Sequence, residues 1–248
     1  AHGVRTVQEE LERALSKVAD ETVSLVCAGR TDTGVHGYAQ VVHIETSAER
    51  DMKAWVMGGN RFLDYDVAIA WAKPVEDDFH ARFSALSRSY RYLICNTPIR
   101  TAVLRQYVCW NYRPLDADKM QEAANYLLGE HDFSSYRAAG CQSKTPQRHI
   151  KHLQVQRQGN MVIVDIQANA FLQHMVRNIV GVLMKIGAGE REPLWAKEVL
   201  ELRDRRQGGV TAPPYGLYFT GVEYPARYQL PSSDKNDFLF PLPFFQVS

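Results

Sequence analysis

Residues 150–167 read IKHLQVQRQGNMVIVDIQ. Two runs of β type, Ile150–Arg157 and Met161–Gln167, lie on either side of Gln158-Gly159-Asn160. A short break containing glycine between two such runs is typical of a β-hairpin. The stretch therefore predicts an antiparallel pair of strands.

Helices and strands alternate on both sides of this hairpin. Ser89–Cys95 alternates in the manner of a half-buried strand, and Phe171–Ile186 carries apolar residues at helical spacing. Thr6 begins a capping box, and Asp116 is a candidate N-cap. The pattern also predicts helices over about 6–18, 52–62, 117–128 and 194–203, and strands over 22–28, 35–45, 67–71 and 217–222. This order predicts an α+β fold, with helices on one face of a mostly antiparallel mixed sheet.

The composition is that of an ordinary globular protein. Of 248 residues 45% are hydrophobic and 23% charged, which excludes a disordered chain, a collagen and a coiled coil. The longest apolar run falls short of the roughly 20 residues that a membrane helix needs, and the first residues, AHGVRTVQEE, contain no apolar signal core. The four cysteines form no Cys-x-x-Cys motif. We therefore expect a cytoplasmic protein with free thiols and no membrane association.

The net charge of +1 conceals an uneven distribution. Residues 1–81 hold 8 Lys/Arg and 14 Asp/Glu, a net of −6; residues 82–157 hold 12 and 5, a net of +7; the remainder holds 9 of each. Aromatic residues are interleaved with arginine in the basic block, as in Tyr90-Arg91-Tyr92. Such a block suits phosphate pairing and base stacking, although a solvated basic face would have the same composition.

Sequence motifs for bound nucleotides and metals are missing. Gly29 and Gly34 have the spacing of P-loop glycines, but Val35 stands where that loop needs lysine. His149 and His152 are at an odd spacing, which on a strand places them on opposite faces. We therefore expect no cofactor and no metal, and a catalytic group drawn from carboxylate, Tyr, Arg or His.

The polar loop 28–37, AGRTDTGVHG, lies between two apolar stretches. Its glycines allow a close approach of backbone to a ligand, and its strands would fix both ends. On the local pattern alone, Asp32 is better explained as a turn residue that bonds its own backbone.

This loop resembles the signature of the TruA family of tRNA pseudouridine synthases. The resemblance extends in order through further blocks: 78–85 (DFHARFSA), 90–92 (YRY), 127–133 (LLGEHDF), 141–146 (CQSKTP), 168–171 (ANAF), 174–181 (HMVRNIVG) and 216–218 (GLY). So many blocks in the same order are specific, and they cover most of the chain.

The resemblance implies a cofactor-independent isomerisation of uridine to pseudouridine at positions 38–40 of the tRNA anticodon arm. It makes Asp32 the catalytic carboxylate, acting by covalent attack or on a glycal-type route, and Tyr90 the residue that stacks on the uracil. Arg177 corresponds to the active-site arginine of the family. A charge within the apolar face of 171–186 is costly to bury alone, and pairing with Asp32 would hold that carboxylate ionised and orient it.

The resemblance also implies which residues meet the RNA. The substrate-binding candidates are Arg30, Arg50, Phe79, His80, Ala81, Arg82, Phe83, Gly140, Cys141, Gln142, Ser143 and Lys144, with Leu217 as a wall of the uracil pocket or a plain core residue. Family members are homodimers, with one tRNA spanning both subunits. They begin with a strand and a Gly-Trp-Gln segment ahead of the first helix, whereas this sequence starts close to that helix, so we expect an open sheet edge there.

The resemblance further implies two similar subdomains flanking a central cleft. We expect an N-terminal α/β subdomain over 1–86 that carries the Asp32 loop, a C-terminal α/β subdomain over 87–225, and an aromatic and proline-rich tail over 226–248. Three other functions remain open. They are a nucleoside hydrolase, which would need a second carboxylate, a non-catalytic RNA-binding module, and a synthase for other uridines.

Overall fold

The computed structural model describes residues 5–231. Within them the chain forms two compact units. The first contains residues up to Arg30, then Val41–Ala85 and Tyr224–Pro231; the second contains Thr31–Gln40 and Leu86–Glu223. Most of the expected tail, residues 232–248, lies outside the described residues.

The second unit is built on a seven-stranded sheet with the order β2-β9-β4-β8-β7-β6, and β5 pairs with β4. Most neighbours are antiparallel, and β2–β9 and β4–β5 are parallel. The predicted hairpin is confirmed as β7–β8, which turns at Gly159 with a φ of +56°. The strands are β2 (His36–Gly37), β4 (Ser87–Asn96), β5 (Cys109–Asn111), β6 (Gly129–Asp132), β7 (Gln147–Gln158), β8 (Met161–Ala168) and β9 (Leu217–Glu223).

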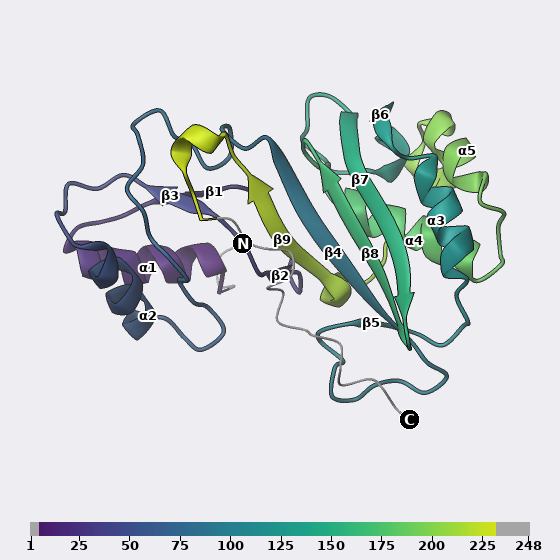
Figure 1. Ribbon diagram of the computed structural model, residues 1–248, viewed down its shortest axis with the longest axis horizontal. Coiled ribbons are helices and arrows are strands. Elements are labelled where there is room, and N and C mark those ends of the chain that lie inside the picture. The colour runs from purple at the N-terminus through teal and green to yellow at the C-terminus, as the bar shows by residue number, and fades with distance from the viewer. Residues whose placement is uncertain (1–4, 232–248) are drawn as a thin grey trace. The chain divides into compact units, whose positions relative to one another are not determined.

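Three helices cover one face of this sheet: α3 (Ala117–Asn125), α4 (Met175–Gly187) and α5 (Trp195–Leu202) (Figure 1). Their apolar faces share one core with Tyr92 and Ile94 of β4. Leu93 and Cys95 face the opposite side, where Val108 covers them. The predicted α+β class is confirmed. The middle of β4 is buried on both faces rather than half-buried, because the segment at Val108 packs over its second face.

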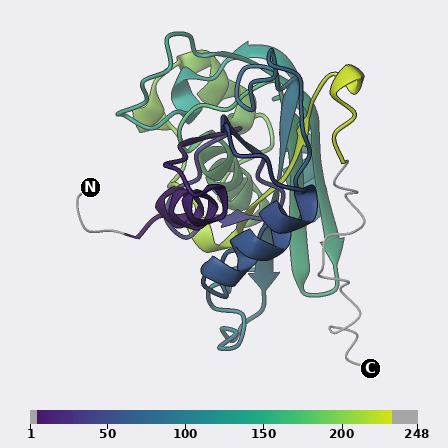
Figure 2. The same cartoon turned by 90° about the vertical axis from the view of Figure 1, so that its left-hand side faces the viewer.

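The first unit packs helices against a two-stranded antiparallel sheet, β1 (Leu25–Cys27) with β3 (Val42–Ile44). The helix α1 (Val7–Ala19) begins as predicted at Thr6, whose side chain accepts the amide of Glu9. It lies beside the single helical segment formed by a π-turn (Ala54–Gly58) and α2 (Gly59–Phe62) (Figure 2). Two glycines make room here, since a Cβ on Gly58 would lie 3.2 Å from Val18 of α1, and one on Gly59 would lie 2.5 Å from the Ile69 side chain.

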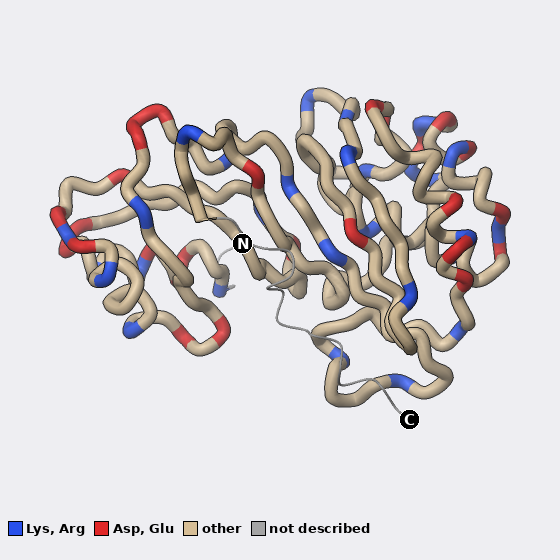
Figure 3. Tube along the Cα trace, in the orientation of Figure 1, with Lys and Arg blue, Asp and Glu red and all other residues tan. Residues whose placement is uncertain are grey.

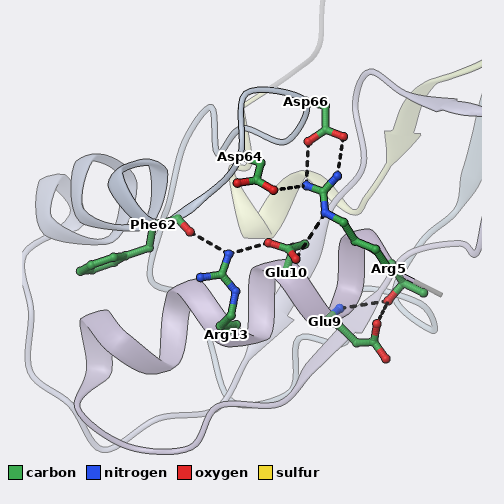
Figure 4. Close-up of polar contacts among 8 residues, drawn as sticks. Arg5, Glu9, Glu10, Arg13, Phe62, Asp64 and Asp66 are labelled. Carbon is green, nitrogen blue, oxygen red and sulfur yellow. Dashed lines mark hydrogen bonds and ion pairs between the residues drawn. The ribbon is translucent and has the colours of Figure 1, made fainter. Parts of the chain in front are cut away.

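An ionic network fixes the start of α1 to the 62–66 turn (Figure 4). Arg5 bonds both carboxylate oxygens of Asp66 and pairs with Asp64 and Glu10. Arg13 pairs with Glu10 and donates to the Phe62 carbonyl. Asp66 above all, together with Glu10 and Asp64, raises the pKa of Arg5 above its usual range. The network thus joins the helix to the turn that follows α2.

Three sequence predictions were wrong in detail. The stretch predicted as β over 35–45 forms two short strands of different sheets, because β2 pairs with β9 and β3 pairs with β1. Residues 67–71 form no strand, because the backbone N–H and carbonyl of Ile69 bond the side chain of Asn60 instead of a neighbouring strand. The helix predicted from Phe171 begins at Met175, because His174 adopts a left-handed φ of +60° that stops the helical backbone there.

The loop with Asp32 belongs to the second unit, whereas the sequence placed it in a subdomain over residues 1–86. The reason is that β2 pairs with β9, His36 against Tyr218, which draws residues 31–40 to the large sheet. That the two units are similar subdomains beside a cleft stays a prediction. Within residues 5–231, no helix has the length and apolar character to cross a membrane.

Candidate active site

The loop between β1 and β2 presents Asp32 at the surface of the second unit. A turn bond from the Val35 amide to the Asp32 carbonyl, 3.0 Å, folds the backbone. Gly34 then takes a φ of +83°. A Cβ at this position would lie 3.1 Å from the Pro214 side chain and 3.2–3.3 Å from the Tyr215 ring. Only glycine fits both the backbone angle and that space. The Asp32 side chain is left about one-third exposed, with 32% of its surface open.

Arg177 of α4 reaches this carboxylate. Its Nη1 lies 2.8 Å from Oδ2 of Asp32, and the arginine side chain is only 13% exposed. Its Nε donates to the carbonyl of Ala212 over 2.8 Å. The ion pair expected from the sequence is therefore present, and a second hydrogen bond fixes the plane of the guanidinium.

His174 also contacts Asp32, and sequence reasoning gave it no role. Its Nε2 lies 3.2 Å from the same oxygen, Oδ2. It precedes Arg177 by three positions, a spacing that brings side chains to one helix face and that could have signalled the contact. Arg177 and His174 therefore both contact Oδ2, and neither of these contacts involves Oδ1.

Tyr90 lies on the helix-covered face of the sheet. Its ring meets Phe171 and Phe219 edge to face, with centroids 5.1 and 5.0 Å apart. Tyr92, two residues along the same face, is fully buried and donates to the Pro213 carbonyl over 2.7 Å. Burial raises the pKa of Tyr92 well above its ordinary value. Tyr92 is therefore held as a neutral donor, and Tyr90 is the more accessible of the two rings.

Leu217 begins β9 and is buried in the core that also contacts Tyr90. His36, at the end of the Asp32 loop, places Nε2 at 2.9 Å from the Gln106 carbonyl and 3.2 Å from that of Tyr215. Its ring stacks on Tyr218 at 4.5 Å. Since both partners are carbonyl oxygens, His36 carries its proton on Nε2 and anchors the exit of the loop.

The substrate-binding candidates of the first unit have different surroundings. Arg30 is exposed. Arg50 donates to the carbonyls of Val18, Ala19 and Glu49, and so caps the C-terminal end of α1. Phe79 and Ala81 are buried in a small core with Tyr228.

The loop 80–83 presents its other residues outward. Phe83 is 76% exposed, its ring lies 4.3 Å from that of His80, and Arg82 lies 5.6 Å from the Phe83 ring. His80 Nδ1 accepts the amides of Arg82 and Phe83. An aromatic ring, an imidazole and a guanidinium are thereby gathered on one turn.

His43 of β3 supports this turn from below and was missed in the sequence. Its Nδ1 accepts the Ala81 amide over 3.1 Å, and its ring lies 4.8 Å from that of His80. Burial, followed by the neighbouring charge of His80, lowers the pKa of His43. The acceptor role needs the neutral ring.

The segment 140–144 belongs to the second unit. Gly140, Gln142 and Lys144 are exposed, whereas Cys141 packs partly against the main core. Ser143 accepts a bond from Arg148, which also donates to the carbonyls of Thr145 and Gln147. Burial lowers the pKa of Arg148. Arg148 thus shapes the loop from inside.

Groups of three or more His, Cys, Asp or Glu side chains that could hold a metal ion do not occur between residues 5 and 231. What the site offers is a carboxylate that is about one-third exposed, an arginine and a histidine that contact one of its oxygens, and an aromatic ring on the helix-covered face of the sheet. The arrangement fixes the orientation of one carboxylate, a group that can act as a general base or as a nucleophile.

Comparison with known proteins identifies the family. The sequence profile described as tRNA pseudouridine synthase matches residues 1–84 and 123–225. A protein of Alcanivorax borkumensis named tRNA pseudouridine synthase A is 59% identical over 229 residues, 92% of this chain and 86% of that protein. Proteins of the same name from Pseudomonas aeruginosa (58%; 92% of this chain, 80% of that protein) and Coxiella burnetii (55%; 96% and 91%) are also similar. The chain belongs to the tRNA pseudouridine synthase family, whose members are isomerases acting on tRNA.

Proposed function

We propose that this protein isomerises uridine to pseudouridine at positions 38–40 of the tRNA anticodon arm, with Asp32 as the catalytic carboxylate. The observation that carries the assignment of Asp32 is its 2.8 Å ion pair with Arg177. The family membership supports the reaction, and the ordered blocks of similar sequence support the uridine positions.

The reaction breaks the bond between C1′ and N1 and forms a bond between C1′ and C5. The uracil turns in between, C5 loses its proton and N1 gains one, so neither electrons nor groups are imported. Asp32 attacks C1′ or removes a sugar proton, and both routes need a carboxylate of fixed orientation. Since Arg177 and His174 hold Oδ2, Oδ1 is the oxygen presented to the sugar.

Tyr90 would stack on the detached uracil and take part in the transfer of the C5 proton. Phe171 and Phe219 support it by holding its ring from two sides. Leu217 closes the same side of the pocket from the core. A ring fixed at its edges offers a rigid face, which lowers the entropy lost when a base stacks on it.

Two surface loops would bind the tRNA backbone and bases. The first is residues 80–83, where Phe83 offers a stacking face and Arg82 a charge. The second is residues 140–144 with the exposed Lys144. Phe79 and Ala81 are buried and hold the first loop, and the exposed Arg50 caps α1; that these three residues contact RNA stays a prediction.

Two basic residues of the sheet are paired with carboxylates of the same sheet. Blue positions recur along β4 and β7 in Figure 3. Of these, Arg91 forms a two-point ion pair with Asp165, and Lys151 lies 3.5 Å from Glu223. The charge excess of residues 82–157 therefore overstates what this face offers to phosphate.

A homodimer that places one tRNA across two subunits, and a cytoplasmic location, complete the proposal. The dimer rests on the family resemblance. The location rests on the four free thiols, Cys27, Cys95, Cys109 and Cys141, which suit a reducing compartment.

Release of tritium from tRNA containing [5-³H]uridine tests the proposal. The wild type should release tritium, and Asp32→Asn, which keeps the shape and removes the charge, should not. A substrate with cytidine in place of uridine at position 38, 39 or 40 should release less tritium, by the amount that the replaced uridine contributes. Unchanged release from a substrate lacking all three uridines would reject the positions, and release by Asp32→Asn would reject the carboxylate. A folded wild type that binds tRNA and releases nothing would favour the RNA-binding module.

A further inference from the structure

The segment 209–213 crosses α4 in direct backbone contact. A Cβ on Gly181 of α4 would lie 1.9 Å from the Val210 carbonyl oxygen, and one on Gly209 would lie 3.0 Å from the Gly181 backbone. Contact this close requires glycine on both sides. The segment is therefore seated at one position along the helix.

Ala212 of this segment forms two hydrogen bonds with Arg177. Its N–H donates to the Arg177 carbonyl over 3.1 Å, and its carbonyl accepts from Arg177 Nε over 2.8 Å. The next residue, Pro213, accepts the Tyr92 hydroxyl over 2.7 Å. The aim of the guanidinium at Asp32 therefore depends on where Ala212 lies.

Thr211 and Asn178, the chain neighbours of Ala212 and Arg177, form a second bridge between the segment and α4. Thr211 donates its hydroxyl to Oδ1 of Asn178 over 2.7 Å. Arg205 Nη2 donates to both, at 3.0 Å to Asn178 and 2.9 Å to Thr211. Asn178 is 2% exposed, and its amide donates to the Tyr136 carbonyl over 2.7 Å. All three side chains are thereby engaged with one another.

We propose that Asn178, Arg205 and Thr211 are positioning residues for Arg177: their network fixes the 209–213 segment on α4, and Ala212 then aims the guanidinium at Asp32. The inference rests on the proposed role of Arg177. Residues 177–178 and 211–212 are adjacent pairs, so a slip of the segment breaks both bridges together. The network touches neither Asp32 nor the loops assigned to tRNA.

The test uses two substitutions of one residue. Thr211→Val keeps the shape and removes the hydroxyl, whereas Thr211→Ser keeps the hydroxyl. Thr101→Val is the matched control, because it removes a hydroxyl that accepts the Leu104 amide elsewhere in the same unit. Single-turnover tritium release and tRNA affinity are measured for each, with the melting temperature as a check on folding.

A misplaced catalytic group is costly, so Thr211→Val should slow turnover about tenfold or more while tRNA affinity changes less than about twofold. Thr211→Ser and Thr101→Val should stay within about twofold of the wild type. In an Arg177→Lys background, adding Thr211→Val should cost less than about twofold, because the residue being positioned has gone. A purely structural role would instead give the same loss in both backgrounds.

Arg205→Met with Arg205→Lys provides a second pair, which serves if Thr211→Val does not fold. The inference is overturned if Thr211→Val and Arg205→Met turn over like Thr101→Val while Arg177→Met is inactive. It is also overturned if Thr211→Val slows turnover by the same factor in the Arg177→Lys background as in the wild type. A wild type that binds tRNA and releases no tritium would overturn the proposed function as well, so the two failures are distinguishable.

Discussion

Arg177 and Asp32 are separated by 145 positions in the sequence, and their side chains meet at 2.8 Å. One lies on a helix behind the large sheet and the other on a loop that joins two units of the chain. The arginine is mostly buried and the carboxylate is about one-third exposed. The buried arginine thus fixes the orientation of a carboxylate that remains open to solvent.

Arg177→Met should abolish most of the turnover. We expect a loss of about 100-fold or more in kcat, because the carboxylate loses the partner that orients it. Arg191→Met is the control, since it makes the same chemical change at an exposed arginine that lies over Trp195. Equal turnover by the two variants, both folded, would show that the ion pair has no catalytic role.

His174 has a backbone role and a contact role that two variants separate. Asparagine adopts a left-handed φ readily but is too short to reach Asp32. Valine disfavours the left-handed φ and has no polar group to contact Asp32. We expect His174→Asn to melt near the wild type and His174→Val to melt lower, with reduced tritium release in both. Full activity of His174→Asn would remove the contact with Asp32 from the mechanism.

His43 should make the stability of the fold depend on pH. Its pKa in the folded protein is lowered, chiefly by burial, below the unfolded value of about 6.5. The unfolded chain therefore binds the proton more readily, and the free energy of unfolding falls as pH drops from about 6.5 through the folded pKa.

Melting curves between pH 7.5 and 5 of the wild type and of His43→Asn measure this effect. Asparagine keeps an acceptor for the Ala81 amide and does not titrate. The wild type should lose more melting temperature on acidification than the variant, since other groups titrate in both. Parallel curves would contradict the assignment.

Arg82→Ala should weaken tRNA binding in a way that salt reveals. If Arg82 neutralises one phosphate, the slope of log affinity against log salt falls by about one unit. The deficit then shrinks as salt rises. Arg100→Ala is the comparison, an exposed arginine of the same basic block that we assign no role. A deficit that is constant in salt would exclude the phosphate contact.

Two glycines of α4 should respond differently to alanine. Gly181→Ala places a methyl against the Val210 backbone carbonyl, and we expect a cost of about 3 kcal/mol or more in the free energy of unfolding. Gly187→Ala meets mainly the flexible end of Met120, and the gain in helix propensity, about 1 kcal/mol, offsets part of the strain. Chemical denaturation of both variants measures the difference, and equal costs would contradict the fixed seat of the 209–213 segment.

Local signals in the sequence were sufficient for many elements. The hairpin β7–β8 follows from two β-type runs about a glycine, and the starts of α1 and α3 follow from Thr6 and Asp116, which cap them. Each of these depends on neighbours within a few positions. Residues 67–71 were misread because a distant side chain, Asn60, satisfies the backbone of Ile69.

Some residues of the candidate site could also be predicted from the sequence, and others could not. Asp32 and Arg177 could be found from ordered blocks of sequence, and the cost of burying a lone charge even predicted their pairing. His174 and His43 could not, because a histidine in a sequence shows neither its backbone angle nor what its ring faces. That Arg50 binds RNA stays a prediction, and its bonds to three carbonyls of its own unit are visible only in the fold.

The α+β class, the hairpin, the helix caps and the family can be predicted from the residues alone, because they rest on periodicity, short-range hydrogen bonding and residue order. Three relations emerge only in the folded chain: the Asp32 loop joins the large sheet through β2 and β9, Arg177 and His174 contact one oxygen of Asp32, and Ala212 bonds the Arg177 guanidinium. Those relations join residues far apart in the chain. They arise from packing and backbone hydrogen bonds that no local pattern records.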